Sequence, residues 1–297
     1  MTIINKLIFV PLALYMLVGC STTGLKLSVA NNAAKLGDYS VVSSLHYGDL
    51  ESQILDIYRP TRSSIQSQDQ NISSLPVIVF FYGGCWGNCG FYKKNEYAFV
   101  AEAFTDQNYI VVIADYRFYP SVLFPEIIQD ARLAVEWVHD NIGSYGGDSD
   151  SMFLMGHSAG AHLAALLTLD ERYLAADSYK SLKGFVGLAG PYDFLPFTKD
   201  YQKILFGPEE QYANSQPINF VNGSEPPMLL LYGNDDKTVK PRNIESLSSK
   251  VDQSGGYVKV HRYNGVGHAE ILGALSRLVR ADYTITQDIL EFLKEHL

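Results

Sequence analysis

Apolar and polar positions alternate differently before and after residue 77, and this contrast predicts how the chain is organised. After residue 77, continuous apolar runs are typical of strands covered on both faces, and we expect strands at Val77–Tyr82, Tyr109–Ala114, Met152–Met155, Phe185–Leu188, Met228–Tyr232 and Tyr257–Val260. Apolar residues at helical spacing predict helices at Asn95–Gln107, Phe124–Asn141, Ser158–Leu169, Ile244–Val251 and Ile285–His296. This alternation predicts an α/β fold in which helices flank a mostly parallel sheet.

Upstream of these strands the pattern is that of an antiparallel hairpin. The β-rich segments Tyr39–Tyr47 and Gln53–Tyr58 are separated by a Gly-Asp pair, which favours a turn. Residues 61–75 are polar and predict a surface loop. Since no long linker divides the chain, we assign residues 38–297 to one domain and residues 20–37 to a tether with a short helix.

The N-terminal segment differs from the rest of the chain. Lys6 precedes an unbroken apolar run, Leu7–Val18, which is shorter than the roughly 20 residues that a membrane-spanning helix needs. Such a run is typical of a signal peptide, and its end, Gly19 followed by Cys20, resembles a bacterial lipobox. We therefore expect residues 1–19 to be a lipoprotein signal peptide and Cys20 to carry the lipid. The alternative is an ordinary signal peptide followed by a chance cysteine.

A lipid anchor would place the protein in the bacterial cell envelope, facing the periplasm or the exterior. The net charge of −9 and the lack of a basic cluster exclude nucleic acid as an expected partner. If Cys20 is acylated, Cys85 and Cys89 remain as an even pair in an oxidising compartment, and we hypothesise a disulfide between them. Two free thiols are the alternative. Two cysteines without a nearby histidine predict no metal site, and no cofactor is implied.

One short motif carries the clearest chemical signal. Gly156-His157-Ser158-Ala159-Gly160 lies between the expected strand Met152–Met155 and the helix after it. In this context the serine of a G-x-S-x-G sequence sits on a sharp, strained turn that exposes its hydroxyl, and the glycines leave room for neighbouring backbone. We therefore expect Ser158 to be a nucleophile. The alternative is a glycine-rich turn with an incidental serine.

A serine hydroxyl needs a base, and in this arrangement the acid and then the histidine follow the serine along the chain. Three histidines come late enough, namely His261, His268 and His296. His261 falls in a strand pattern and His296 at the C-terminus, whereas His268 follows the last expected strand in a Gly-Val-Gly loop. We assign His268 as the general base, with a surface loop histidine as the alternative.

The acid is expected just after the strand Met228–Tyr232, where Asp235 and Asp236 are adjacent. Asp236 stands in a G-x-x-D-x-x-V spacing that resembles the acid turn of serine hydrolases. We therefore expect Asp236 to orient His268 and to stabilise its charged form. Asp235 is the alternative acid, and we otherwise expect it to be a turn or capping residue. Asp193 is the third and least favoured choice.

Tyr82-Gly83-Gly84-Cys85-Trp86 follows the first of the expected parallel strands. Acyl transfer needs N–H donors aimed at the developing oxyanion. We expect the backbone N–H groups of Gly84, Cys85 and Ala159 to supply them. A glycine-rich turn that only links a strand to a helix is the alternative.

Together these motifs resemble those of carboxylesterases in the hormone-sensitive-lipase and bacterial-esterase-like group of α/β-hydrolases, which is related to kynurenine formamidases. The resemblance runs from about Ser28 to the C-terminus, and besides the loops above it is carried by Leu55–Pro60, Asp115–Arg117, Tyr145–Asp148 and Gly190–Asp193. It implies an α/β-hydrolase fold and a catalytic triad of Ser158, His268 and Asp236.

Two positions depart from the pattern of this family. Tyr82 stands where the family has a histidine that braces the oxyanion loop, so its hydroxyl must replace those hydrogen bonds or the loop must rely on packing. Cys85 takes the place of a third glycine, and a bridge to Cys89 would stiffen the loop.

Residues 191–226 precede the acid-bearing strand and are rich in aromatic residues. We expect this insert to form a small cap over Ser158 that shapes the acyl or alcohol pocket, with Trp86, Phe91 and Tyr92 as another wall. Aromatic walls and a short cap favour small to medium, apolar or aryl esters. The alternative is a surface excursion with its own packing.

The sequence therefore predicts a serine carboxylesterase that cleaves a small-molecule ester through an acyl-enzyme. An amidase or formamidase using the same residues is the alternative among enzymes, because the motifs do not reveal the leaving group. A non-catalytic binding lipoprotein on a hydrolase scaffold is the alternative outside enzymes, because a fold alone does not establish activity.

Overall fold

The protein is described here by a computed structural model that covers residues 22–61, 74–90 and 92–297. The expected signal peptide and lipid-bearing Cys20 lie outside the described residues. So do Phe91 and most of the loop expected at residues 61–75.

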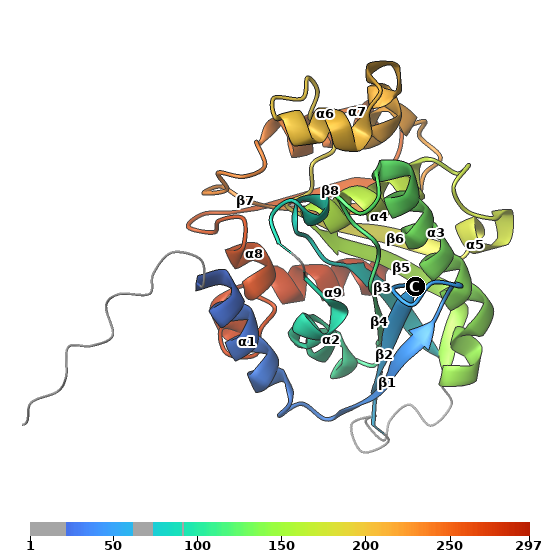
Figure 1. The fold of residues 1–297 in the computed structure, drawn as a ribbon. Coiled ribbons are helices and arrows are strands. Elements are labelled where there is room, and N and C mark those ends of the chain that lie inside the picture. The colour runs from blue at the N-terminus through green and yellow to red at the C-terminus, as the bar shows by residue number, and fades with distance from the viewer. Residues whose placement is uncertain (1–21, 62–73, 91) are drawn as a thin grey trace, which may run out of the picture.

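Within the described residues, an eight-stranded sheet forms the centre of the molecule (Figure 1). The strand order is β1-β2-β4-β3-β5-β6-β7-β8. The pairings of β1 with β2 and of β2 with β4 are antiparallel, and the later pairings are parallel. The strands are β1 Tyr39–His46, β2 Ile54–Pro60, β3 Leu75–Phe81, β4 Ile110–Ala114, β5 Gly147–His157, β6 Leu182–Leu188, β7 Met228–Gly233 and β8 Val258–Tyr263.

Burial explains why the strands were visible in the sequence. Every residue of β4 and β7 is buried, because helices cover both faces of the sheet there. The edge strand β1 is only half-buried or exposed, as expected for the outer strand of a hairpin. The predicted α/β fold, with its mostly parallel sheet and N-terminal antiparallel hairpin, is confirmed. β5 begins at Gly147 rather than Met152, because its first residues are polar and gave no apolar signal.

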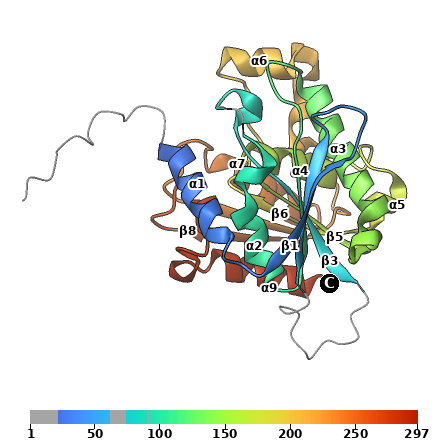
Figure 2. The same ribbon diagram turned by 60° about the horizontal axis from the view of Figure 1, so that its bottom comes forward.

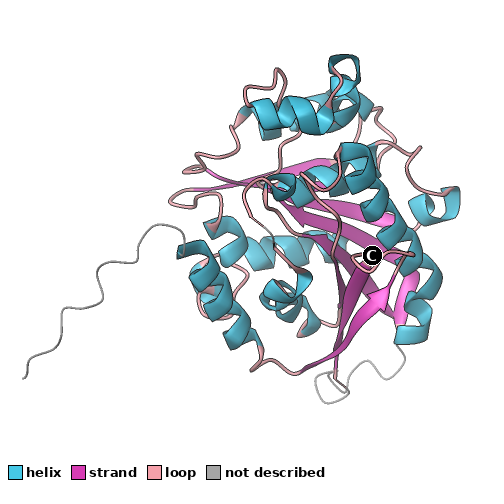
Figure 3. Cartoon of the chain, in the orientation of Figure 1, coloured by secondary structure: helices cyan, strands magenta, loops and turns pink. Residues whose placement is uncertain are grey.

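Helices cover both faces of this sheet (Figures 2 and 3), with α3 and α4 on one face and α2 and α9 on the other. The helices are α1 Thr22–Ala34, α2 Ala98–Thr105, α3 Phe124–Asn141, α4 Ala159–Leu169, α5 Ala176–Lys180, α6 Asp200–Phe206, α7 Arg242–Gln253, α8 Glu270–Gly273 and α9 Ile285–Glu295. Helices α5, α6 and α8 are too short for hydrophobic periodicity to predict them. In the part of the chain that the structure describes, no helix combines the length and apolar character needed to cross a membrane.

The segment expected to be a tether with a short helix is mostly helical, because α1 covers Thr22–Ala34. This 13-residue helix packs against α2, and Ala30 and Ala34 are buried. The sequence gave little sign of this because two of the three larger apolar residues of α1, Leu25 and Val29, are exposed, and the third, Leu27, is only half-buried. Small alanines make the contact instead, and alanines do not form a visible apolar stripe.

The insert at residues 191–226 builds an aromatic cluster with the oxyanion loop. Phe194 and Phe206 pack with ring centroids 5.6 Å apart, and Trp86 lies 5.7 and 5.0 Å from these two rings. Phe197 stacks on Phe206 at 5.0 Å. The aromatic residues of the insert are therefore used mainly to attach it to the body of the protein.

His162 is the polar centre of this cluster. The indole Nε1–H of Trp86 donates to His162 Nδ1 at 3.1 Å, and His162 Nε2–H donates to the carbonyl of Ser215 at 2.7 Å. Both ring nitrogens of a neutral imidazole are thereby satisfied, although the side chain is completely buried. Burial lowers the pKa of His162 to about 4, so the ring is neutral at physiological pH.

This burial predicts acid sensitivity. Between pH 6.5, the usual pKa of a histidine, and about pH 4, the unfolded chain binds a proton at His162 that the folded protein does not. Stability is therefore expected to fall by as much as about 1.4 kcal/mol per pH unit from this group as pH decreases through that window. Urea unfolding at pH 7 and pH 5 measures the effect.

His162→Gln removes the titrating ring, so its stability should depend less steeply on pH than that of the wild type, even if it is lower at pH 7. His139→Gln, which changes a partly exposed histidine on α3, serves as the control. Equal pH dependence in the wild type and His162→Gln would contradict the explanation.

Candidate active site

Ser158 lies at the sharp turn between β5 and α4. Its backbone has φ 54° and ψ −122°, a conformation that costs energy for a residue with a side chain. The two flanking glycines make the turn sterically feasible. A Cβ on Gly160 would lie 2.0 Å from the carbonyl oxygen of Phe81, and one on Gly156 would lie 2.4 Å from that of Gly160. The motif therefore has the local structure that its sequence predicted.

Ser158, His268 and Asp236 are joined by hydrogen bonds, although they come from three separate loops. His268 lies between β8 and α8, and its Nε2 is 2.9 Å from Ser158 Oγ. Asp236 lies just after β7, and its Oδ2 is 2.7 Å from His268 Nδ1. The structure thus brings together the three side chains that the sequence singled out.

The surroundings of Asp236 fix the direction of these hydrogen bonds. Burial alone would raise the pKa of Asp236, but the hydrogen bond and charge of His268, with the N–H groups of Val239 and Thr238, bring it below its usual value. A charged carboxylate can only accept, so His268 Nδ1–H donates to it. In the neutral ring, Nε2 is then free to accept the hydroxyl proton of Ser158.

The alternative acids lie elsewhere. Asp235 is exposed, and its backbone N–H donates to the carbonyl of Val266 at 3.0 Å. This bond ties the acid turn to the loop that carries His268. Asp193 forms an ion pair with Arg242 at 3.6 Å. Neither aspartate contacts His268.

The alternative histidines are also occupied elsewhere. His261 lies on β8, 3.9 Å from Asp288. His296 packs against Tyr257 and Phe292 near the C-terminus. Only the loop position of His268 reaches Ser158 among the histidines that the structure describes.

The loop after β3 turns through a run of residues with positive φ. Gly84, Cys85 and Trp86 have φ of 133°, 52° and 55°, and a disulfide joins Cys85 to Cys89 with 5.3 Å between the Cα atoms. In the described structure, the N–H groups of Gly84 and Cys85 donate to no backbone carbonyl. Ala159 begins α4, and the first N–H groups of a helix lack partners inside it. These three expected donors are therefore free to bind an anion.

Tyr82 supports this loop both by a hydrogen bond of its hydroxyl and by packing of its ring. Its hydroxyl donates to Asp115 Oδ1 at 2.8 Å, and the backbone N–H of Lys94 donates to the same oxygen at 2.6 Å. Its ring stacks on those of Tyr97 and Tyr116 at 4.9 and 5.0 Å. The hydroxyl of Tyr116 also donates to the Tyr82 carbonyl at 2.7 Å.

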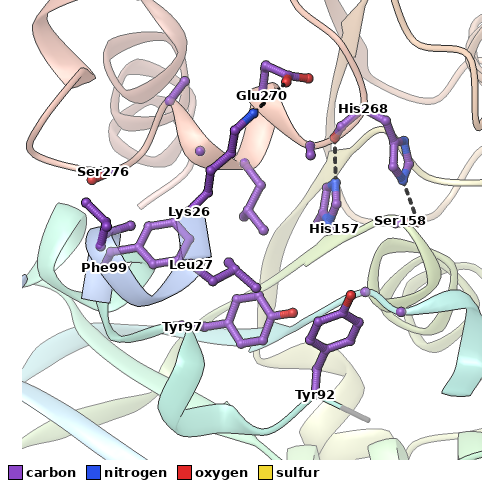
Figure 4. A pocket seen from close by; sticks show the side chains of 18 of the residues that line it. Lys26, Leu27, Tyr92, Tyr97, Phe99, His157, Ser158, His268, Glu270 and Ser276 are labelled. Carbon is purple, nitrogen blue, oxygen red and sulfur yellow. Dashed lines mark hydrogen bonds and ion pairs between the residues drawn. The ribbon is translucent and has the colours of Figure 1, made fainter. Parts of the chain in front are cut away.

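A cavity of about 780 Å³ extends from Ser158 and His268 (Figure 4), a size typical of small-molecule sites. Near the serine it is lined by the loop after β3, including both bridged cysteines and Tyr92. Farther away it lies between α1 and residues 269–283. Most of this lining is apolar, and Lys26 and Glu270 are the charged residues among the described residues that line it.

The expected contribution of the insert to this cavity is wrong. No residue of 191–226, all of which the structure describes, lines it. Trp86, expected as a wall, instead turns toward the insert, whereas Tyr92 does line the cavity. The insert and the cavity lie on opposite sides of the loop after β3, and the sequence could not reveal to which side the insert folds. The role of α1 as a wall was missed for the same reason.

His157 is a further residue that the sequence analysis did not assign. It is 8% exposed, and its Nε2–H donates to the backbone carbonyl of His268 at 2.8 Å. Burial, together with the charge of His268, lowers the pKa of His157 to about 3. It is therefore a neutral donor that holds the loop carrying His268, and its position beside Ser158 was the one available signal.

The BD-FAE family model matches residues 55–251, a range that includes Ser158 and Asp236. Three relatives illustrate how similar this chain is to other proteins of related sequence.

The chain is 26% identical over 252 residues to a probable isoprenylcysteine alpha-carbonyl methylesterase of Arabidopsis thaliana, covering 77% of this chain and 51% of that protein. It is 29% identical over 247 residues to esterase LipC of Mycobacterium tuberculosis, with coverage of 77% and 57%. It is 25% identical over 253 residues to kynurenine formamidase of Danio rerio, with coverage of 83% and 80%. The chain thus spans little more than half the length of the first two relatives.

Solved structures show the same fold. Esterase B from Lactobacillus rhamnosis, determined with a tributyrin phosphonate inhibitor, has a TM-score of 0.74 at 17% identity, with 93% of each chain covered. A truncated carbohydrate esterase from gut microbiota has a TM-score of 0.71 at 22% identity, with 87% of this chain and 98% of that chain covered. These likenesses establish the α/β-hydrolase fold.

The bond from His157 predicts a positioning effect on Ser158. His157→Phe keeps the ring volume but removes the donor, so the loop should lose the support that holds His268 against the serine. We expect a fluorophosphonate to react with Ser158 about 10- to 100-fold more slowly, because small misplacements of reacting groups have effects of this size. The labelling rate, measured by mass spectrometry of the intact protein, gives the answer.

His157→Gln is the matched variant, since its amide N–H can donate to the same carbonyl. It should restore much of the labelling rate. If both variants react as fast as the wild type, the carbonyl bond has no positioning role. If both are equally slow, loss of packing rather than loss of the donor is the cause.

Proposed function

The chain belongs to the BD-FAE family of α/β-hydrolases, and from this premise we propose that it is a serine carboxylesterase that uses Ser158, His268 and Asp236. The observation that carries the proposal is the unbroken hydrogen-bonded chain from Ser158 Oγ through His268 to Asp236. A cavity that begins at this serine supports it. The esterases among the relatives support it as well.

The proposed reaction has two halves. Ser158 Oγ attacks the ester carbonyl carbon while His268 Nε2 takes the hydroxyl proton, and Asp236 stabilises the resulting imidazolium. The carbonyl oxygen becomes an oxyanion, which the N–H groups of Gly84, Cys85 and Ala159 would bind. When the C–O bond breaks, His268 returns the proton to the departing alcohol. Water then attacks the acyl-enzyme in the same way and releases the acid and the free serine.

The lining of the cavity favours small to medium apolar or aryl esters. Its walls near the serine are formed by glycines, the disulfide and tyrosine rings, and its far walls are mainly aliphatic. Such a pocket gains binding energy from apolar groups. No cofactor is needed for this chemistry, and the described residues contain no cluster that could hold a metal ion.

Hydrolysis of an amide is the second candidate. The similarity to kynurenine formamidase, over 80% of that protein, favours it specifically. The same serine, histidine and aspartate would act, but His268 would have to protonate a poorer leaving group. A non-catalytic binding lipoprotein would use the cavity without the hydrogen-bonded chain, and reactivity of Ser158 separates it from both enzymes.

We also propose that Cys20 carries a lipid and holds the protein on the bacterial cell envelope. The support is the apolar run followed by Gly19 and Cys20. Helix α1 begins at Thr22, so its Leu25 lies no more than roughly 18 Å from Cys20 along the chain. Exposed apolar side chains gather around the cavity mouth, namely Leu25, Val29, Leu278 and Val279.

The esterase proposal predicts covalent labelling and loss of activity together. A fluorophosphonate should label the protein at Ser158, and Ser158→Ala should abolish labelling and lower kcat for nitrophenyl esters by at least about 10⁴-fold. Thr168→Ala, which changes another buried hydroxyl on α4, should retain both. Labelling at a different residue, or none, would falsify the proposed nucleophile. Matched nitrophenyl esters and anilides then distinguish an esterase from an amidase.

The lipid proposal predicts metabolic labelling. When the full chain is produced in a bacterium supplied with an alkyne analogue of palmitate, the protein should carry the label and remain with the membrane fraction. Cys20→Ala should carry no label, whereas Ser21→Ala should behave as the wild type. Persistent labelling of Cys20→Ala would place the lipid on another residue and sink the proposal.

A further inference from the structure

Helix α1 forms a wall of the cavity that begins at Ser158, although the two are far apart in the sequence. Leu25, Lys26, Leu27, Val29 and Ala30 all line the cavity. In Figure 4, Ser158 and His268 lie on one side of the cavity, Phe99 and Ser276 lie on the opposite side, and Lys26 and Leu27 of α1 lie between them. The cavity thus runs from the reactive serine to a cleft between α1 and residues 269–283, whose rim is exposed.

We propose that the cleft between α1 and residues 269–283 is the subsite for the apolar chain of the ester, and that Leu27 limits the length of chain that fits. This inference rests on the proposed esterase function. It assigns a specificity-determining role to an N-terminal helix that lies outside the part of the chain that the family model matches.

The position of α1 is fixed well enough for it to act as a wall. Asn31 Nδ2 donates to the carbonyl of Asn95 at 2.6 Å, and the N–H of Phe99 donates to Asn31 Oδ1 at 3.3 Å. These two bonds fasten the last turn of α1 to the start of α2 and to the turn just before it. Ala30 and Ala34 are buried beside them, so the helix cannot shift without losing both polar and apolar contacts.

The chemistry of the cleft selects an uncharged chain. Leu27 and Ala30 on α1 face a second wall that includes Leu272 and Ala274, both buried. Lys26 Nζ and Glu270 Oε1 lie 3.6 Å apart where α1 meets α8, and both are exposed at the rim. They therefore neutralise each other at the opening. An aliphatic chain gains binding energy between these walls, whereas a charged group would be desolvated without a partner.

Two positions allow the cleft to be shortened from opposite sides. Leu27 is half-buried and projects into the cavity from α1 (Figure 4). Gly273 ends α8 on the facing wall, and a Cβ there would meet no atom within 4 Å. A larger side chain at either position can therefore occupy space in the cleft without disturbing Ser158.

The test compares nitrophenyl esters from acetate to dodecanoate. In the full chain, Leu27→Trp should lower kcat/KM for octanoate and longer esters roughly tenfold or more, because loss of a few buried methylenes has this effect. The value for acetate should stay close to that of the wild type. Ser28→Trp is the matched control, since Ser28 is the exposed neighbour on the same helix and does not line the cavity.

Gly273→Leu tests the chain-length limit independently if Leu27→Trp fails to fold. It should shorten the preferred chain in the same way from the other wall. Gly143→Leu is its control, because Gly143 also has open space around its Cβ position and lies away from the cavity. Leu27→Ala should shift the preference toward longer chains.

The outcomes separate the two proposals. Chain-length profiles of Leu27→Trp and Gly273→Leu that match the wild type, with fluorophosphonate labelling intact, overturn the subsite and leave the esterase standing. A wild type that neither cleaves any ester nor reacts with the fluorophosphonate overturns the proposed function itself. Loss of long-chain activity in Ser28→Trp as large as in Leu27→Trp would show an effect of helix packing and also overturn the subsite.

Discussion

The chemistry of this protein depends on holding one imidazole between a hydroxyl and a carboxylate. His268 achieves this only because the loops after β5, β7 and β8 all leave the same edge of a parallel sheet. Backbone hydrogen bonds then set the distances between these three loops. The N–H groups of Asn234 and Asp235 donate to the carbonyls of Tyr263 and Val266, so the acid turn and the histidine loop move as one unit. The N–H of Ser158 donates to Leu188 on the neighbouring strand, which fixes the third member.

The sequence was sufficient for features that local rules determine. Continuous apolar runs predicted the central strands because both faces of the sheet are covered, and a strained turn needs glycines on both sides of Ser158. The choice between Asp235 and Asp236 also followed from local spacing. Adjacent residues in a turn point in different directions, and the carboxylate of Asp236 is completely enclosed whereas Asp235 is exposed.

The walls of the cavity could not be predicted in this way. Helix α1 reaches the cavity through a contact of small alanines and two hydrogen bonds of Asn31 to residues more than sixty positions away. Neither feature produces a periodic pattern. Tyr82 is similar, because its partner Asp115 lies on a different strand end and the bond could be named only once both were placed. Long-range packing therefore determines the walls of the cavity, whereas local sequence determines the turn that carries Ser158.

The loop after β3 explains how the insert contributes without covering the serine. The loop has two faces. Cys85 and Cys89 line the cavity, whereas Trp86, between them, packs into the aromatic cluster of the insert and donates to His162. The positive φ values of this loop carry a conformational cost, which the disulfide on one face and the buried indole on the other both help to offset. The insert therefore contacts the loop on the face opposite the cavity, where its packing against Trp86 supports the conformation of the loop.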